Sequence, residues 1–320
     1  MELLENDTQP QYKLQFFGKG SEFFGIMIVN WLLTLITLGI YYPWARAKTL
    51  KYVFGSTALN DDRFHFSGTG QEMFIGFLKV IVFLVVFYLL LFSFSLAGPY
   101  ALIGALLMYL LLFLFIPLAI HGSMRYRMSR TSLRGVRFGY RGSKKELFGK
   151  FLPGIFLTII TLGIYGAWFE INLRKYICGN VRYGDVKCHY EANGMDFFVL
   201  NLVGGLLTLV TLGIYSFWYQ KKLFAYYVDN TFFTKDDRRI ELRSTATAGG
   251  FFKLLVGNFF LVVFTLGLGA AWADMRTQQF IIDNIKLEGD IDLNAVQQTE
   301  DEYHNAFGED AIDFFDIDLT

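Results

Sequence analysis

TLGIYYPW at residues 37–44 recurs as TLGIYGAW at 161–168, as TLGIYSFW at 211–218 and, in a looser form, as TLGLGAAW at 265–272. Each copy follows an apolar run and precedes an amphipathic stretch. Its glycine is a residue type enriched at helix C-termini because it tolerates positive φ. Four copies of one pattern indicate a protein built from repeats. We therefore predict that a membrane helix ends at each copy and that an amphipathic helix follows it.

Segments of alternating apolar and polar residues lie between these units, and period-two alternation predicts β-strands. The predicted strands begin, in chain order, at Tyr12, Phe64, Val136, Val186, Arg238 and Ile285. The repeating unit is therefore a strand, a membrane helix, a TLGIY break and an amphipathic helix, present about five times. The predicted repeats are residues 12–63, 64–135, 136–185, 186–237 and 238–293, within one membrane domain of residues 1–293.

The composition favours lipid as the solvent of this domain. Apolar residues make up 53% of the chain and charged residues 18%, against roughly 45 to 50% and about 25% in soluble domains. Six apolar runs approach or exceed the roughly 20 residues that cross a bilayer, at residues 23–42, 73–96, 100–121, 147–169, 197–219 and 251–273. We predict an α-helical polytopic membrane protein with six spanning or near-spanning helices, in which the linking strands form a small membrane-proximal β-sheet.

Two topologies fit this pattern. The second repeat crosses twice, because residues 73–121 hold two apolar runs joined at Ala97, Gly98 and Pro99. In the favoured topology every other repeat also returns to its starting side, the amphipathic helix is re-entrant or interfacial, and the strands share one sheet. In the alternative, each TLGIY unit crosses once and successive units alternate in orientation.

Charge is unevenly distributed along the chain. The formal net charge is zero, but eleven acidic residues and no Lys or Arg follow Lys286, so the preceding part is basic. This balance is expected of loops that face an anionic cytoplasmic leaflet, and nucleic-acid binding is the weaker interpretation. Residues 294–320 are predicted to form a disordered acidic tail, which could instead dock onto the basic loops or recruit a soluble partner. The basic run from Arg125 to Lys145 is expected to hold its loop inside, and recognition of anionic lipid head groups is the alternative.

One long stretch resembles a known family. SEFFGIMIVNWLLTLITLGIYYPWARAKTLKYVFGST at residues 21–57, the later TLGIY copies, FGKGSEFFG at 17–25 and RFHFSGTG at 63–70 resemble the YjgN family of bacterial inner-membrane proteins. The resemblance extends from Tyr12 to about Leu293 and leaves out the acidic tail. It implies a location in the bacterial inner membrane, and it implies no catalytic or binding residues because the family has none established.

Three asparagines within apolar runs, and the tryptophan that recurs at one repeat position, are candidate functional residues. Asn30 and Asn258 each lie seven residues before the threonine of a TLG motif, and Asn201 belongs with them more loosely. Interhelical hydrogen bonding is the structural interpretation, and lining of a polar path is the functional one. The tryptophans are predicted to anchor the helices at the membrane interface, where an amphipathic ring partitions; they are Trp44, Trp168, Trp218 and Trp272.

Charges of opposite sign occupy one repeat position, two residues after the tryptophan. Arg46, Glu170 and Asp274 hold this position in three units. Pairing between repeats would fix their packing, whereas solvated interface positions are the favoured interpretation because exposed ion pairs contribute little.

The sequence lacks the usual signatures of enzymes, nucleotide sites and zinc sites. Cys178 and Cys188 are interpreted as free thiols. We expect neither an enzyme nor a bound cofactor or metal. The first functional hypothesis is a transporter or channel-like protein, since broken helices form midplane sites in transporters; it predicts that Asn30 and Asn258 face a shared hydrated cavity. The second is a non-transporting lipid-interacting or scaffold protein, which predicts a dry, closed bundle.

Overall fold

A computed structural model describes residues 11–96, 98–289 and 291–299 of the chain. Over these residues, antiparallel pairing joins eleven strands into one sheet in the order β3-β2-β1-β11-β10-β9-β8-β7-β6-β5-β4. Its end strands are separated in the chain only by Phe64, so the sheet curls nearly into a ring. The strands are β1 (Gln11–Phe16), β2 (Thr57–Leu59), β3 (Asp62–Arg63), β4 (His65–Phe66), β5 (Thr131–Leu133), β6 (Val136–Tyr140), β7 (Val181–Tyr183), β8 (Val186–Tyr190), β9 (Thr231–Lys235), β10 (Arg238–Ser244) and β11 (Ile285–Gly289).

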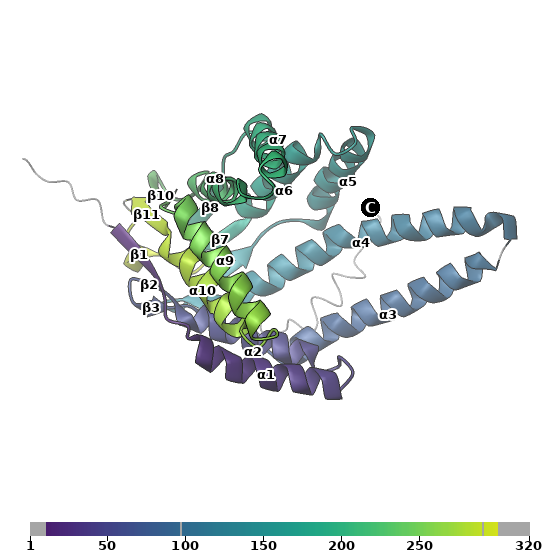
Figure 1. The fold of residues 1–320 in the computed structure, drawn as a ribbon, viewed down its shortest axis with the longest axis horizontal. Helices are drawn as coiled ribbons and strands as arrows, with labels where there is room; N and C mark the ends of the chain where they lie inside the picture. Colours follow the sequence, from purple (N-terminus) through teal and green to yellow (C-terminus); the bar gives the residue numbers. More distant parts are fainter. Residues whose placement is uncertain (1–10, 97, 290, 300–320) are drawn as a thin grey trace, which may run out of the picture.

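Five antiparallel helix hairpins stand on this sheet, each inserted between consecutive strands. Neighbouring hairpins pack side by side, and α10 packs against α1, so the hairpins also form a ring (Figure 1). The α3/α4 hairpin projects far beyond the other four. The helices are α1 (Gly20–Ile36), α2 (Tyr42–Ser56), α3 (Gly70–Ser95), α4 (Ala101–Ser129), α5 (Lys144–Ile160), α6 (Gly166–Gly179), α7 (Gly194–Val210), α8 (Ser216–Asp229), α9 (Ala248–Phe264) and α10 (Ala270–Asp283).

This architecture corrects the predicted fold class. The prediction of an α-helical polytopic bundle with six spanning helices and a small sheet is wrong, because the sheet has eleven strands and two of the described helices, α3 and α4, are long and apolar enough to cross a membrane. The helices α1, α5, α7 and α9 have 17 residues each, which is about 25 Å and short of the roughly 30 Å hydrocarbon core. The predicted runs were longer because they continued through the TLGIY turn into the next helix.

The TLGIY motif folds into one turn at all four positions. Its leucine adopts positive φ, at Leu38, Leu162, Leu212 and Leu266, and the following glycine has φ between 91° and 94°. In the first copy the Thr37 hydroxyl donates to the carbonyl of Leu33 at 2.7 Å and accepts from the Tyr41 amide at 3.0 Å. One side chain thereby caps the end of α1 and the start of α2. The motif thus reverses the chain, so each of these helices returns to the sheet.

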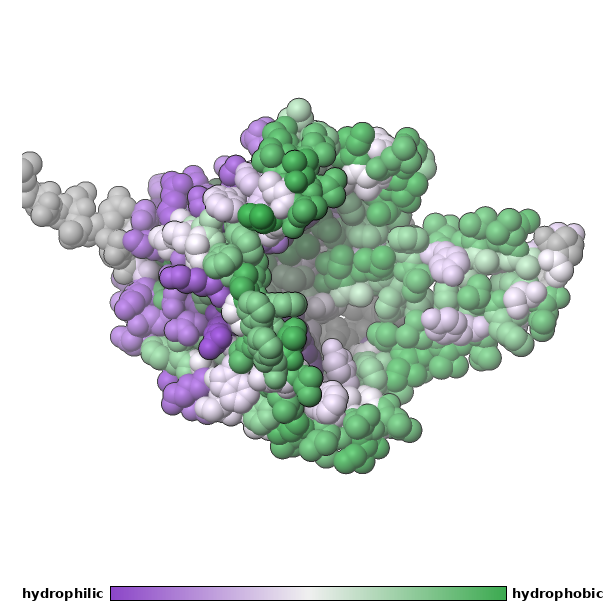
Figure 2. Space-filling model, in the orientation of Figure 1, coloured by the Kyte–Doolittle hydropathy of each residue, from purple (hydrophilic) through white to green (hydrophobic). Residues whose placement is uncertain are grey.

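The two faces of the sheet differ in polarity. One face carries exposed charged side chains such as Lys13, Lys187 and Lys286, and the hydrophilic surface in Figure 2 gathers over the strands, while the hairpins are covered with apolar side chains. The opposite, concave face is apolar, as in an antiparallel sheet with one solvated side. The sheet therefore separates a polar end of the molecule from an apolar one.

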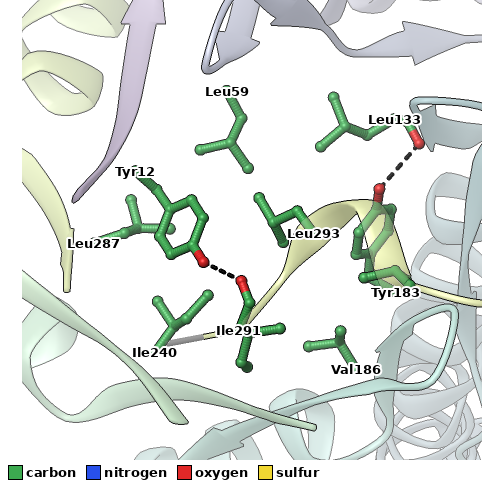
Figure 3. Close-up of a cluster of buried hydrophobic side chains, with 10 residues drawn as sticks. Tyr12, Leu59, Leu133, Tyr183, Val186, Ile240, Leu287, Ile291 and Leu293 are labelled. Carbon is green, nitrogen blue, oxygen red and sulfur yellow. Dashed lines mark hydrogen bonds between the residues drawn. The ribbon is translucent and has the colours of Figure 1, made fainter. Parts of the chain in front are cut away.

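A C-terminal segment fills the concave side of the sheet. Ile291 and Leu293 are buried there among side chains from several strands (Figure 3). Val296 belongs to the same buried cluster. The Tyr12 hydroxyl donates to the carbonyl oxygen of Ile291, and the Tyr183 hydroxyl donates to that of Leu133 at 3.0 Å. We call residues 291–296 the plug, because they occupy the space that the curled sheet encloses.

The chain continues to contact the sheet beyond the plug. The amide of Gln297 donates to Asp185 at 3.2 Å, and the Thr299 hydroxyl donates to the carbonyl of Gly184 at 2.6 Å. The predicted boundary between membrane domain and tail, at residue 293, therefore falls within a segment held by the sheet. Residues 300–320 of the predicted tail lie outside the described residues.

Candidate membrane interface

The turns of the four short hairpins expose leucine almost completely. The side chains of Leu38, Leu162, Leu212 and Leu266 have relative exposures of 93%, 94%, 94% and 93%. A leucine at positive φ is conformationally unfavourable. In water, a leucine this exposed would gain no hydrophobic free energy of burial to offset that cost. Four such leucines, one at each turn, form exposed apolar tips, a feature that marks a surface for contact with lipid or protein. We call these residues the tip leucines.

The same apolar surface continues along the hairpins. Trp31, Ile36, Leu209 and Phe264 are each more than 60% exposed, and the apolar colouring in Figure 2 covers the hairpins on this face of the molecule. The turns at the far ends carry no Asp, Glu, Lys or Arg, and they read TLGIY, LAGPY, TLGIY, TLGIY and TLGLG. The charged residues are thus concentrated toward the sheet, which is the polarity of a protein standing in a membrane.

The three candidate amides join the two helices of their own hairpins. The Asn30 amide donates to the carbonyl of Ala45 at 3.3 Å, and the Asn258 amide donates to the carbonyl of Ala273 at 3.2 Å. The Asn201 side chain accepts from the Tyr219 hydroxyl at 2.5 Å. The structure therefore places all three as interhelical clamps. The hydrogen bonds of Asn30 and Asn258 lie in two different hairpins, α1/α2 and α9/α10, so their described contacts give no support to the predicted transporter.

The repeated tryptophans lie between neighbouring hairpins. Trp168 packs on Phe198 of the next hairpin, with ring centroids 5.5 Å apart, and Trp44 and Trp272 make the corresponding contacts with Phe74 and Phe24. Trp218 is half exposed, and beside it Phe217 contacts Phe252. These rings therefore pack repeat against repeat, and their anchoring in the head-group region stays a prediction.

Close packing at these rings predicts the effect of a single methyl group. A Cβ at Gly194, the first residue of α7, would lie 2.3 Å from the Trp168 ring. Gly194→Ala is expected to destabilise the protein by about 1 to 3 kcal/mol, because the neighbouring hairpin must shift. The measurement is the loss of monodisperse protein with temperature in detergent.

The chain offers a matched control for this substitution. A Cβ at Gly205, in the same helix, meets nothing within 4 Å, so Gly205→Ala should be neutral or stabilising. Adding Trp168→Ala should relieve part of the effect of Gly194→Ala. Equal stability of the Gly194→Ala and Gly205→Ala proteins would show that this contact does not hold the hairpins together.

Charge pairing between repeats, the less favoured alternative for this position, is not seen among the described residues. The described residues contain no ion pair that joins Arg46 to Glu170 or Asp274. Glu170 instead accepts from the Tyr227 hydroxyl at 2.5 Å and lies 3.6 Å from Arg174 of its own helix. The Arg174 guanidinium stacks 3.9 Å from the centroid of the Tyr227 ring. This position is therefore used for packing between α6 and α8.

Part of the basic run from Arg125 to Lys145 is engaged within the protein. Arg130 pairs with Glu72 at 2.9 Å and joins the base of α4 to that of α3. Arg134 pairs with Asp62 at 2.5 Å, and Arg141 donates to the carbonyl of Thr299 at 3.3 Å. These three arginines therefore hold the sheet, the long hairpin and the C-terminal segment together.

The two cysteine thiols contact each other between α6 and β8. The interaction with Cys188 lowers the pKa of Cys178, whereas the pKa of Cys188 is raised by Cys178 and by burial. Both are free thiols. Within the described residues, His, Cys, Asp and Glu form no group of three that could hold a metal ion.

The features that sequence reasoning missed are the tip leucines and the plug. The tip leucines carried a signal, since leucine follows threonine in all four copies of the motif. The plug also carried one, because Ile291, Leu293 and Val296 are apolar residues within an acidic segment. Neither signal identifies by itself what the residues pack against.

Comparison with known proteins gives the family. The family model described as bacterial protein of unknown function (DUF898) matches residues 11–203, 189–239 and 234–314. The chain is 37% identical over 165 residues to the inner membrane protein YjgN of Escherichia coli O157:H7, and the match covers 52% of this chain and 39% of the relative. No solved structure matches the chain.

Two further relatives of the same name agree with this match. The inner membrane protein YjgN of Escherichia coli strain K12 is 36% identical over 165 residues, covering 52% of this chain and 39% of the relative. That of Salmonella typhimurium strain LT2 is 33% identical over 181 residues, covering 53% and 44%. The matches thus span less than half the length of these curated relatives. The chain belongs to the YjgN family of bacterial inner-membrane proteins, whose molecular function is unknown (DUF898).

Proposed function

We propose that this protein is a multi-pass inner-membrane protein that interacts with lipids and does not transport a solute. Its α3/α4 hairpin crosses the bilayer, and the other four hairpins enter only the leaflet on the side of the sheet. The observation that carries this proposal is the set of four tip leucines, 93 to 94% exposed at the ends of helices too short to cross. Hydrocarbon is the environment in which such a turn is favourable.

The lengths of the helices support the two kinds of hairpin. The helices α3 and α4 have 26 and 29 residues, about 39 and 43 Å, which exceeds the hydrocarbon core of roughly 30 Å. A helix of 17 residues reaches at most about 25 Å when it stands upright. Because the four shorter hairpins begin at the sheet, their tips stay within the bilayer.

The return helices limit how deeply the four hairpins can enter. Each carries a polar or charged residue at its fifth position, namely Arg46, Glu170, Gln220 and Asp274. A charge near the bilayer centre costs about 2.5 to 3.5 kcal/mol on insertion scales. These side chains need water, head groups or a protein partner nearby, which keeps the hairpins within one leaflet; Glu170 has such a partner in the Tyr227 hydroxyl.

Two features support a protein without a solute path. The plug fills the concave side of the sheet, with Ile291 fully buried, so the sheet provides no open channel. The intramembrane amides hydrogen-bond within their hairpins rather than facing a common space. The alternative of a lipid-interacting protein agrees better with these contacts than a transporter does.

The distribution of charge predicts the side on which the sheet lies. Lysines and arginines gather on the sheet and its loops, whereas the far turns have none. The positive-inside rule then places the sheet in the cytoplasm and the turn between α3 and α4 in the periplasm.

Cysteine labelling with a membrane-impermeant maleimide tests this topology in a background where Cys178 and Cys188 are replaced by alanine. Tyr100→Cys, in the far turn of the long hairpin, should react only from the periplasmic side. Lys187→Cys, on the sheet, should react only from the cytoplasmic side. Leu38→Cys and Leu212→Cys should react from neither side until detergent is added.

Labelling of Leu38→Cys and Leu212→Cys from the periplasm would show that the short hairpins cross, and it would overturn the proposal. Labelling from the cytoplasm would show that they lie in water. A third variant on the sheet, Lys286→Cys, controls for the orientation of the membranes because it should react together with Lys187→Cys.

A further inference from the structure

Grooves of equal size lie between the two helices of two neighbouring hairpins. The groove of α5/α6 has a volume of about 610 Å³ and that of α7/α8 about 620 Å³. They occupy the same place in the repeat, because Trp168 and Trp218 are 50 residues apart and the lining positions correspond at this spacing. The two grooves can therefore be compared residue by residue.

The grooves differ in charge. Lys150 from α5 and Lys175 from α6 line the first groove, and Leu200 and Ala225 stand at these positions in the second. None of the residues that line the α5/α6 groove is acidic, whereas the α7/α8 groove is lined by two aspartates and two lysines, Asp196, Asp229, Lys221 and Lys222. The α5/α6 groove is thus cationic and its sibling is balanced.

The other two short hairpins also lack this pair of lysines. The positions of Lys150 and Lys175 correspond to Ile26 and Lys51 in α1/α2. In α9/α10 they correspond to Leu254 and Gln279. Among the four short hairpins, α5/α6 alone carries a lysine at both positions.

The two lysines lie at the same height above the tip. Lys150 is ten residues before the end of α5, and Lys175 is nine residues after the start of α6, which places them about 15 and 14 Å from the tip turn. One leaflet of hydrocarbon is about 15 Å thick. With the hairpin inserted in one leaflet, both lysines stand at the level of the lipid phosphates.

The groove changes from polar to apolar toward the tip. Lys150 and Lys175 line its part toward the sheet, Pro153 and Phe169 line the part nearer the tip, and Asn172 lies at about the height of Pro153. The Lys150 ammonium lies 5.8 Å from the centroid of the Tyr176 ring, and Lys150 forms no ion pair among the described residues. This order of groups matches a phospholipid, with its charged head group next to the sheet and an acyl chain along the helices.

We propose that the α5/α6 groove binds an anionic phospholipid, whose phosphate accepts from Lys150 and Lys175 and whose acyl chain lies against Pro153 and Phe169. This inference rests on the proposed insertion of the hairpins into one leaflet, and it adds the site and the class of lipid. Zwitterionic phosphatidylethanolamine carries its own ammonium group, so the two lysines favour phosphatidylglycerol over it.

Native mass spectrometry of the purified full chain tests the site, with phosphatidylglycerol and phosphatidylethanolamine titrated in separate detergent solutions. The test variant is Lys150→Leu with Lys175→Ala. It introduces the side chains found at the equivalent positions of the α7/α8 groove, which accommodates them. Phosphatidylglycerol binding should weaken roughly 10- to 30-fold, since each cationic side chain near an anionic lipid surface contributes about a fivefold factor. Binding of phosphatidylethanolamine should change little.

A control pair removes the same charge from the water-facing side of the sheet. Lys187→Ala with Lys286→Ala should leave phosphatidylglycerol binding unchanged, and Lys150→Arg with Lys175→Arg should retain it. Glycerol phosphate in excess should fail to displace the lipid, because it lacks the acyl chain that the groove contacts. The inference would be overturned if phosphatidylglycerol binding weakened equally in the Lys150→Leu, Lys175→Ala variant and the Lys187→Ala, Lys286→Ala variant. Displacement of the lipid by glycerol phosphate would also overturn it.

The outcome can be separated from that of the proposed insertion. Labelling of Leu162→Cys in the Lys150→Leu, Lys175→Ala variant reports whether the α5/α6 tip stays in lipid. A protected tip with undiminished phosphatidylglycerol binding would refute the site alone. A labelled tip in the protein that keeps both lysines would refute the insertion itself.

Discussion

Replacing the tip leucine Leu212 by aspartate is expected to expel the α7/α8 hairpin from the membrane. An aspartate in hydrocarbon costs about 2.5 to 3.5 kcal/mol and the lost leucine adds up to about 0.6 kcal/mol, so insertion of this hairpin should weaken more than a hundredfold. The local backbone does not oppose the change, because aspartate adopts positive φ more readily than leucine. Maleimide labelling of Leu209→Cys, in the same hairpin, measures the expulsion.

The same substitution separates lipid from water as the surroundings of the tip. At a side chain 94% exposed, a change to aspartate in water is usually within about 0.5 kcal/mol, and Leu209→Cys would then be labelled equally with or without it. Leu212→Ala serves as the control, since it shortens the side chain without adding charge and should leave Leu209→Cys protected. Equal labelling in all three proteins would contradict the proposed insertion.

Replacing Ile291 by alanine is expected to loosen the sheet. Ile291 is fully buried in the plug among side chains from several strands, and such a truncation typically costs about 2 to 5 kcal/mol. The temperature at which half of the monodisperse protein is lost in detergent should fall by about 5 to 15 °C. Ile291→Asp should be more severe because it buries an unpaired charge.

A neighbouring residue on the same segment provides the control for the plug. The Asn294 side chain accepts from Arg134 at 2.9 Å in an exposed contact, so Asn294→Ala should lower the stability by no more than about 1 kcal/mol, because exposed contacts to charged groups contribute little. An unchanged thermal transition in the Ile291→Asp protein would show that residues 291–296 do not fill the sheet in the membrane-embedded protein.

The sequence predicted most of the elements but not their assembly. Every long alternating segment became a strand, including VKCHY at β8 and RRIEL within β10. The predicted strands leave out β2, β3, β5, β7 and β9. The first four have two or three residues, too few to show a period of two, and TFFTK of β9 does not alternate. These short strands pair with the long ones, so without them the sheet looked small.

The number of spanning helices could not be read from hydropathy alone. The apolar run at residues 197–219 is long enough for one crossing, yet α7 ends at Val210 and the chain reverses at Leu212. Hydropathy does not record a reversal when the turn itself is apolar. The glycine of TLGIY indicates the turn. The strands before and after each hairpin belong to one sheet, so the second helix must return to it.

The candidate residues that recur in more than one repeat proved to have structural roles. Asn30 and Asn258 clamp their hairpins, and Trp44, Trp168 and Trp272 pack repeat against repeat. Lys150 and Lys175 lie instead where the repeats differ. Comparison of equivalent positions in the structure was needed to show that both line one groove.

The most direct test of the central claim is the depth of a tip leucine, measured with a nitroxide spin label on Leu212→Cys in lipid bilayers. If the four short hairpins enter one leaflet, the label should collide with oxygen, which concentrates in hydrocarbon, more than with a water-soluble nickel complex. A label on Tyr100→Cys should show the opposite. Preferential collision of the Leu212→Cys label with the nickel complex would place this tip in water and contradict the account.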